Sequence, residues 1–297
     1  MMRSTLHAGA AAASALLAAG VALAAPEAAV PEAARLAALA FPGWDDSVSG
    51  RVQTVQVPPG GGGGHTGWRA GALRVVVEPR LVLREGERLT LIAGLVPAAE
   101  DGHSLAAPVT PMALAAYQFE RSGGAWKLSA RQGIFAWRGF EGTATLRAVA
   151  LAERRQGLGV EYGSCWQGYC GTWLALYELD KGTVRPEPAV ELALSGSNVG
   201  GVGDCPRRLQ PLLKPRPDSA QRGEAGEQEH DCYAVESSWT LDPAGQQPGD
   251  LSIRYQGALS RAGTRLSPPI AIDQRQVLRY GSGKYRAVSG FNPVPAL

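Results

Sequence analysis

A repeated pattern of short apolar segments separated by turn residues, which runs from Ala72 to the end of the chain, most constrains the fold. Residues 73–78 and 81–83 are rich in Leu and Val, residues 84–87 form a charged turn around Gly86, and residues 89–93 are apolar again. Similar units of strand, turn and strand follow at 146–162 and 235–255, while helical periodicity is absent after residue 45. The sequence therefore predicts an all-β fold built from antiparallel hairpins.

Two segments before these strands differ from the pattern. Residues 31–41 carry apolar side chains at helical spacing between Pro31 and the pair Pro42-Gly43, which predicts one short helix within residues 25–50. Residues 51–68 contain Pro58-Pro59 and the glycine run 60–64, and we interpret this range as a Gly-rich flexible loop. A phosphate-binding loop is the alternative, but no Gly-Lys-Ser/Thr follows the glycines. Residues 69–297 are predicted to form a single β domain.

The strand region contains an internal sequence similarity. Residues 114–120 match residues 174–180 at an offset of 60, and each segment is followed by a charged turn that contains Gly. A third segment, residues 277–286, repeats the ending in which Gly precedes an aromatic and a basic residue. This pattern predicts a hairpin whose turn needs positive φ and whose aromatic residue packs across the strands. Repeated hairpins would place Tyr117 and Tyr177 in equivalent positions.

These three segments resemble the outer strands of bacterial propeller blades of the FG-GAP or VCBS kind, and are similar to segments of uncharacterised exported proteobacterial proteins. The resemblance implies a propeller-like repeat of antiparallel hairpins. The calcium loop of the FG-GAP pattern is missing, because residues 120–123 and 180–182 lack the alternating oxygen ligands. A β-sandwich is the alternative architecture, since its strands follow nearly the same pattern.

The first residues have the pattern of a secretory signal peptide. Arg3 precedes a run of small apolar residues from Ala8 to Ala22, and the run ends in Ala22-Leu23-Ala24. We expect cleavage after Ala24, which leaves a chain without a membrane span. An uncleaved membrane anchor is the alternative, but the apolar run is shorter than the ~20 residues that such an anchor needs. No cysteine precedes Cys165 to serve as a lipoprotein anchor. The leader and the Ala-, Gly- and Arg-rich composition predict a bacterial protein of the periplasm or the medium.

The chain has four cysteines, all in its second half, and an even number in an exported chain indicates disulfide bonds. We predict sequential pairing, Cys165 with Cys170 and Cys205 with Cys232. The first pair encloses four residues that a hairpin tip can close, and the second brackets a polar segment, 204–232, that we interpret as a long surface loop. Redox catalysis is the alternative for the first pair, but its usual spacing is two residues rather than four.

Residues able to carry catalysis or bind a metal are sparse. Outside the leader, the histidines are His65, His103 and His230; each lies in a predicted loop, and none has metal-ligand spacing to another. No Gly-x-Ser-x-Gly motif is present, although a triad can assemble from distant residues. With 29 basic against 27 acidic residues and no basic stripe, nucleic acid is not an expected partner. The sequence predicts no metal and no cofactor.

Aromatic residues around the small cysteine loop are the candidate binding feature. Trp166, Tyr169 and Trp173 cluster there, and a bridged loop can present rings to a sugar, a peptide or a partner surface with little loss of entropy. In the alternative interpretation, Trp173 packs in the core and Trp166 covers the disulfide.

The sequence thus predicts an exported, non-catalytic cell-envelope protein with a binding or accessory role, whose partner is an envelope glycan or protein. The alternative is an envelope hydrolase that acts on glycan or peptide bonds. A histidine side chain within hydrogen-bond reach of a Ser or a carboxylate, beside an apolar cleft, would favour the hydrolase.

Overall fold

A computed structural model describes residues 30–60, 67–210, 212, 230–243, 245–262 and 269–296. The predicted signal peptide 1–24, His65 and most of the glycine run lie outside the described residues. Among the described residues, no helix combines the length and the apolar character needed to cross a membrane.

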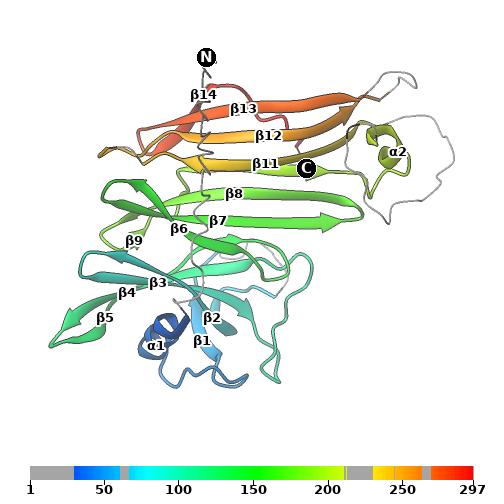
Figure 1. The fold of residues 1–297 in the computed structure, drawn as a ribbon. Coiled ribbons are helices and arrows are strands. Elements are labelled where there is room, and N and C mark those ends of the chain that lie inside the picture. Colours follow the sequence, from blue (N-terminus) through cyan, green and yellow to red (C-terminus); the bar gives the residue numbers. More distant parts are fainter. Residues whose placement is uncertain are drawn as a thin grey trace, which may run out of the picture.

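The strands form two antiparallel sheets (Figure 1). The first sheet has five strands in the order of the chain: β1 (Val52–Val57), β2 (Gly71–Glu85), β3 (Arg88–Pro97), β4 (Met112–Ser122) and β5 (Ala125–Arg138). The second sheet has nine strands in the order β14-β13-β12-β11-β10-β8-β7-β6, with β9 paired to β8. Its strands are β6 (Thr145–Ala152), β7 (Arg155–Trp166), β8 (Tyr169–Asp180), β9 (Thr183–Val184), β10 (Val190–Ser197), β11 (Cys232–Leu241), β12 (Leu251–Ser260), β13 (Ile270–Gly281) and β14 (Lys284–Ser289).

Of the four apolar cores among the described residues, three lie between successive layers of the molecule and the fourth surrounds Cys205 and Cys232. Helix α1 (Val30–Ala40) packs on the outside of the first sheet, where Leu36 contributes to the first core. The second core joins the first sheet to β7, β8 and β9 through residues such as Leu114 and Tyr177. The third core lies between β6, β8 and β10 on one side and β11–β14 on the other, around Leu176 and Tyr255. In Figure 1, α1 lies at the bottom, the first sheet above it, and β11–β14 at the top.

The second sheet curls on itself to enclose the third core. A bulge between Ala193 and Ser195 interrupts the β8–β10 register, and β10 pairs with β11 at only two positions. The edge strand β14 then returns towards β10, because Tyr285 N donates a hydrogen bond of 2.8 Å to Ala189 O. The segment after β14 crosses back as well, with Asn292 Nδ2 donating to Ala193 O at 2.8 Å. These hydrogen bonds satisfy edge groups that would otherwise be left unpaired.

Polar side chains of the first sheet hold the short strand β9. Thr90 Oγ1 donates to Gly182 O at 2.9 Å, and the Gln132 amide pairs with both backbone groups of Val184, at 2.6 and 2.9 Å. Thr90 is 2% exposed, so its hydroxyl needs this partner. The β8–β9 turn therefore fixes the two sheets relative to each other.

The prediction of an all-β fold with a short helix at residues 31–41 is confirmed. The hairpins also have the expected turns, because Gly123-Gly124, Lys181-Gly182 and Ser282-Gly283 all adopt positive φ. The described strands do not form the expected propeller-like repeat, because they make sheets of five and nine strands instead of similar small blades. Tyr117 lies in the core beside α1, with its ring centroid 4.8 Å from that of Phe41, whereas Tyr177 lies between the two sheets.

Two range assignments also need correction. Strand β1 lies within 51–68, the range assigned to a loop, because the alternating Val and Gln residues of Val52–Val57 pair with β2. Helix α2 (Cys205–Leu209) lies within 204–232, also assigned to a loop, and it begins with Pro206 in its first turn. A helix of five residues gives little periodic signal in a sequence.

Candidate functional site

The β7–β8 hairpin carries all three predicted binding residues. Its turn is formed by Gln167 and Gly168, both with positive φ, and Cys165 lies directly opposite Cys170. The predicted Cys165–Cys170 disulfide is present. Side chains alternate between the faces of a strand, so the disulfide lies on one face and the aromatic residues lie on the other. We call that other face the hairpin surface; it consists of Tyr162, Ser164, Trp166, Tyr169, Gly171 and Trp173.

Two aromatic rings stack at the base of the hairpin surface. The ring centroids of Tyr162 and Trp173 are 5.7 Å apart with an interplanar angle of 17°, and Phe140 lies 6.1 Å from Trp173. The Tyr162 hydroxyl donates to Glu191, and burial together with this hydrogen bond raises the pKa of Tyr162. Trp173 is therefore half-buried in an aromatic stack rather than enclosed in one of the apolar cores.

The tip of the hairpin surface is more exposed. The Trp166 residue is 60% exposed and Tyr169 is 42% exposed. Tyr169 is partly occupied by the loop after β10, since a Cβ atom on Gly201 would lie 2.6 Å from its ring. Trp166 does not cover the disulfide, because it projects from the opposite face of the strand. Of the three predicted residues, Trp166 thus offers the largest accessible ring.

A shallow pocket of about 180 Å³ adjoins the hairpin surface. It is lined by Pro108, Phe140, Glu141, Thr143, Gly163, Ser164 and Cys165. The first four come from the loops that follow β3 and β5, and sequence reasoning did not find them. Of these four residues, only Phe140, the third ring of the aromatic stack, had a signal in the sequence, namely its aromatic side chain. Glu141 has φ of 53°, which a non-glycine residue rarely adopts and which helps to turn the loop at the pocket.

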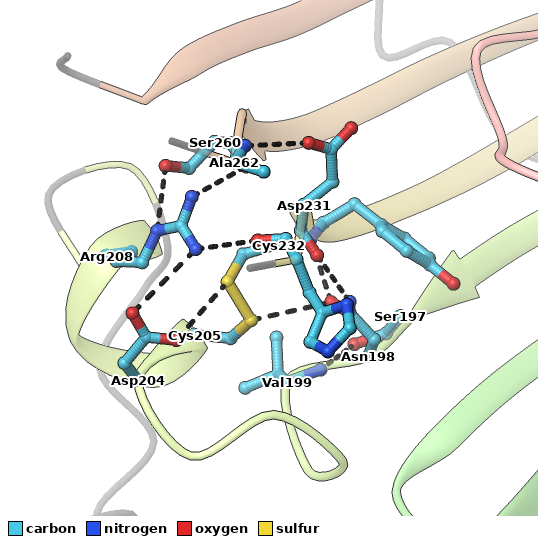
Figure 2. The surroundings of a disulfide bond; sticks show 12 residues. Ser197, Asn198, Val199, Asp204, Cys205, Arg208, Asp231, Cys232, Ser260 and Ala262 are labelled. Atoms are coloured by element: carbon cyan, nitrogen blue, oxygen red, sulfur yellow. Dashed lines mark hydrogen bonds and ion pairs between the residues drawn. A yellow bond between two sulfur atoms is a disulfide. The ribbon is translucent and has the colours of Figure 1, made fainter. Parts of the chain in front are cut away.

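The second predicted disulfide, Cys205–Cys232, is also present and connects α2 to β11 (Figure 2). Both cysteines are fully buried. Asn198 braces the same region, because its Nδ2 donates to Asp231 O at 2.7 Å and its Oδ1 accepts from Tyr233 N at 2.9 Å. The Ala262 amide donates a hydrogen bond to Asp231, and this interaction lowers the pKa of the Asp231 carboxyl.

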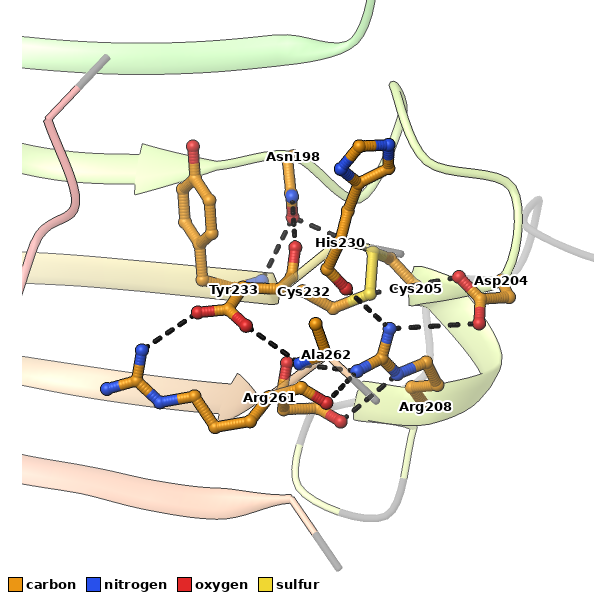
Figure 3. A network of polar contacts seen from close by, with 11 residues as sticks. Asn198, Asp204, Cys205, Arg208, His230, Cys232, Tyr233, Arg261 and Ala262 are labelled. Atoms are coloured by element: carbon orange, nitrogen blue, oxygen red, sulfur yellow. Dashed lines mark hydrogen bonds and ion pairs between the residues drawn. A yellow bond between two sulfur atoms is a disulfide. The ribbon is translucent and has the colours of Figure 1, made fainter. Parts of the chain in front are cut away.

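Arg208 of α2 completes this region (Figure 3). Its guanidinium donates to the carbonyl oxygens of Ser260 at 3.1 Å, Arg261 at 2.6 Å and His230 at 2.9 Å. Its side chain is 6% exposed, and Asp204 lies 3.8 Å away. Asp204, Cys205 and Cys232 place potential ligand atoms within 4.8 Å of one another, but the two sulfur atoms are bonded together. This cluster therefore anchors α2 to the end of the second sheet.

A buried carboxylate, Glu178, is the other ionisable group that stands out. It is 2% exposed and accepts from Arg155, from Arg185 at 3.0 Å and from the Tyr280 hydroxyl at 2.7 Å. Its oxygens are satisfied by these donors, so the cluster links β7, β8 and β13 and needs no ligand.

The histidines do not form the arrangement expected of a hydrolase in the part of the chain that is described. His103 and His230 are exposed, and no hydrogen bond or ion pair joins either imidazole to a Ser or a carboxylate of the described residues. His65 lies outside the described residues.

Comparison of the chain with protein-family models, with curated proteins and with solved structures gives no match.

Proposed function

We propose that this chain is an exported, non-catalytic protein of the bacterial cell envelope, periplasmic or secreted, that binds an envelope component through the hairpin surface. The observation that carries the proposal is the exposed ring of Trp166 on a hairpin that is closed by a disulfide and flanked by a pocket.

Two features support export. The leader at 1–24 has the organisation of a signal peptide, and two disulfides are compatible with an oxidising compartment. Cleavage after Ala24 gives a mature chain that starts at Ala25, which an intact-mass measurement checks on the material used in every experiment below.

The hairpin surface is suited to binding because it is rigid before a ligand arrives. The disulfide and the two-residue turn restrain the tip, and Gly168 packs directly against Gly200 of the neighbouring loop. Aromatic side chains that are already ordered lose little entropy on binding, and Trp is prominent among residues that dominate binding energy.

The test is the Trp166→Ala variant. We expect its affinity for an envelope fraction to fall by at least about 2 kcal/mol, because the ring is the main contact. Its melting temperature should stay close to that of the parent protein, because a 60% exposed ring contributes little to the core. Sedimentation with the envelope fraction and thermal unfolding of the same preparation give both values.

Phe291→Ala is the matched control, since Phe291 is 63% exposed and follows β14, outside the hairpin surface. Its retention should equal that of the parent protein. A Trp166→Ala variant that melts several degrees lower yet is retained normally would refute the proposal.

A further inference from the structure

We infer that the ligand of the hairpin surface is a neutral glycan chain, with one pyranose ring in the pocket and the following rings extending towards Trp166. This inference rests on the proposed function and specifies the ligand class of that site.

The size of the pocket favours a single ring. Its volume of about 180 Å³ is below the roughly 300–1,000 Å³ typical of sites that enclose a whole drug-sized ligand. Trp166 lies two positions along β7 from the pocket residue Ser164, on the same face of the strand and at a distance of roughly 7 Å. A chain with one ring in the pocket therefore reaches the exposed Trp166 ring with its next unit.

The lining of the pocket matches the two kinds of surface on a sugar. Phe140 and Pro108 are apolar, and a pyranose presents C–H groups on its ring faces. Glu141, Thr143 and Ser164 supply carboxylate and hydroxyl groups that can pair with ring hydroxyls. Sites for small molecules commonly combine apolar walls with a few polar groups that fix orientation.

The charge at the pocket disfavours an anionic ligand. Glu141 is the one charged residue among those that line it. The nearest base in the sequence, Arg138, is paired with Glu191 at 2.8 Å and is not free to neutralise an acid. A phosphorylated or carboxylated chain would meet repulsion here, whereas neutral hydroxyls can donate to the Glu141 carboxylate.

A peptide is the competing ligand class for the same place. Strand β6 pairs with β7 only as far as Glu161, so the next residues of β7 have a free edge to which a peptide strand could add. The pocket lies at residues 163–165 of this edge and is bounded by Phe140 and Pro108. The whole free edge, residues 162–166, has the roughly five residues of a typical strand, so the titration below includes a peptide as a competing ligand.

The experiment is isothermal titration of the mature protein with hexamers of β-1,4-linked glucose and of β-1,4-linked N-acetylglucosamine. A carboxylated hexamer of β-1,4-linked glucuronic acid and an extended neutral hexapeptide serve as competing ligand classes. We expect at least one neutral hexamer to bind, the acidic hexamer and the peptide to bind at least tenfold more weakly, and Trp166→Ala to weaken binding by about 30-fold.

Two further variants test the pocket itself. Ser164→Leu places a larger side chain beside the pocket, and we expect at least a tenfold loss of affinity for the neutral hexamer. Thr172→Leu is the matched control, because Thr172 is exposed on the opposite face of the same hairpin, where it contacts Ser195. Its affinity should remain within about twofold, and thermal unfolding confirms that both variants fold.

The outcomes separate this inference from the proposed function. If no neutral hexamer binds while retention on the envelope fraction still depends on Trp166, the proposed function stands and the glycan assignment is wrong. Binding of the hexapeptide with the same dependence on Trp166 and Ser164 would assign the site to peptides. Equal losses in Ser164→Leu and Thr172→Leu would show that the pocket takes no part.

Discussion

Replacing Tyr177 by alanine is expected to lower the free energy of unfolding by about 4 kcal/mol. Tyr177 is fully buried in the core between the two sheets, where its ring centroid lies 5.5 Å from that of Phe135. Removing the ring leaves a cavity at the contact that joins the sheets, and the surrounding strands cannot collapse to fill it. Urea unfolding followed by tryptophan fluorescence measures the loss.

Tyr169→Ala is the matched control, because the same substitution is made in the same strand at a residue that is 42% exposed. We expect it to cost at most about 1 kcal/mol. A loss of stability in Tyr169→Ala as large as that in Tyr177→Ala would contradict the packing of the two sheets around this core.

Removal of the Cys205–Cys232 disulfide is expected to have the next largest effect. Replacing both cysteines by serine should cost about 3.5 kcal/mol, since the bridge closes a loop with a sequence separation of 27. The same replacement at Cys165 and Cys170 should cost only about 2 kcal/mol, because their separation is 5. Denaturant unfolding of the two double variants gives the comparison.

The order of these two losses is the critical result. A greater loss at Cys165 and Cys170 would mean that the hairpin tip, rather than the anchoring of α2, limits stability. Replacing Cys165 and Cys170 should also weaken binding at the hairpin surface, because their disulfide keeps that surface rigid.

Local features of this fold could be predicted from the sequence because neighbouring residues determine them. The helix near residues 31–41 follows from apolar spacing between prolines, and the hairpin turns follow from glycines that permit positive φ. Both disulfide pairings followed from the even number of cysteines and their spacing. Each of these signals lies within a short stretch of chain.

The internal sequence similarity shows where prediction from local sequence fails. Residues 114–120 and 174–180 are alike because β4 and β8 are both central strands, covered on their two faces, and each runs into a Gly turn. Residues 112–117 of β4 and 174–179 of β8 are buried without interruption. A shared environment produces the same apolar run as a structural repeat does, so the pattern alone could not distinguish them.

The candidate site was predicted in part for a related reason. Trp166, Tyr169 and Trp173 are close in sequence, and their shared face follows from strand alternation. Phe140, Glu141 and Thr143 reach the pocket only because β6 folds beside β7 and brings the preceding loop with it. Contacts between distant segments depend on the register of the sheet, which one sequence does not reveal.

Hydrogen–deuterium exchange of the mature protein, measured with and without the envelope fraction that retains it, tests the role of the hairpin surface most directly. We expect slower exchange within residues 140–143 and 162–173 when the fraction is present, and unchanged exchange in β12, β13 and β14. Protection confined to those three strands, or no protection near Trp166, would contradict binding at the hairpin surface.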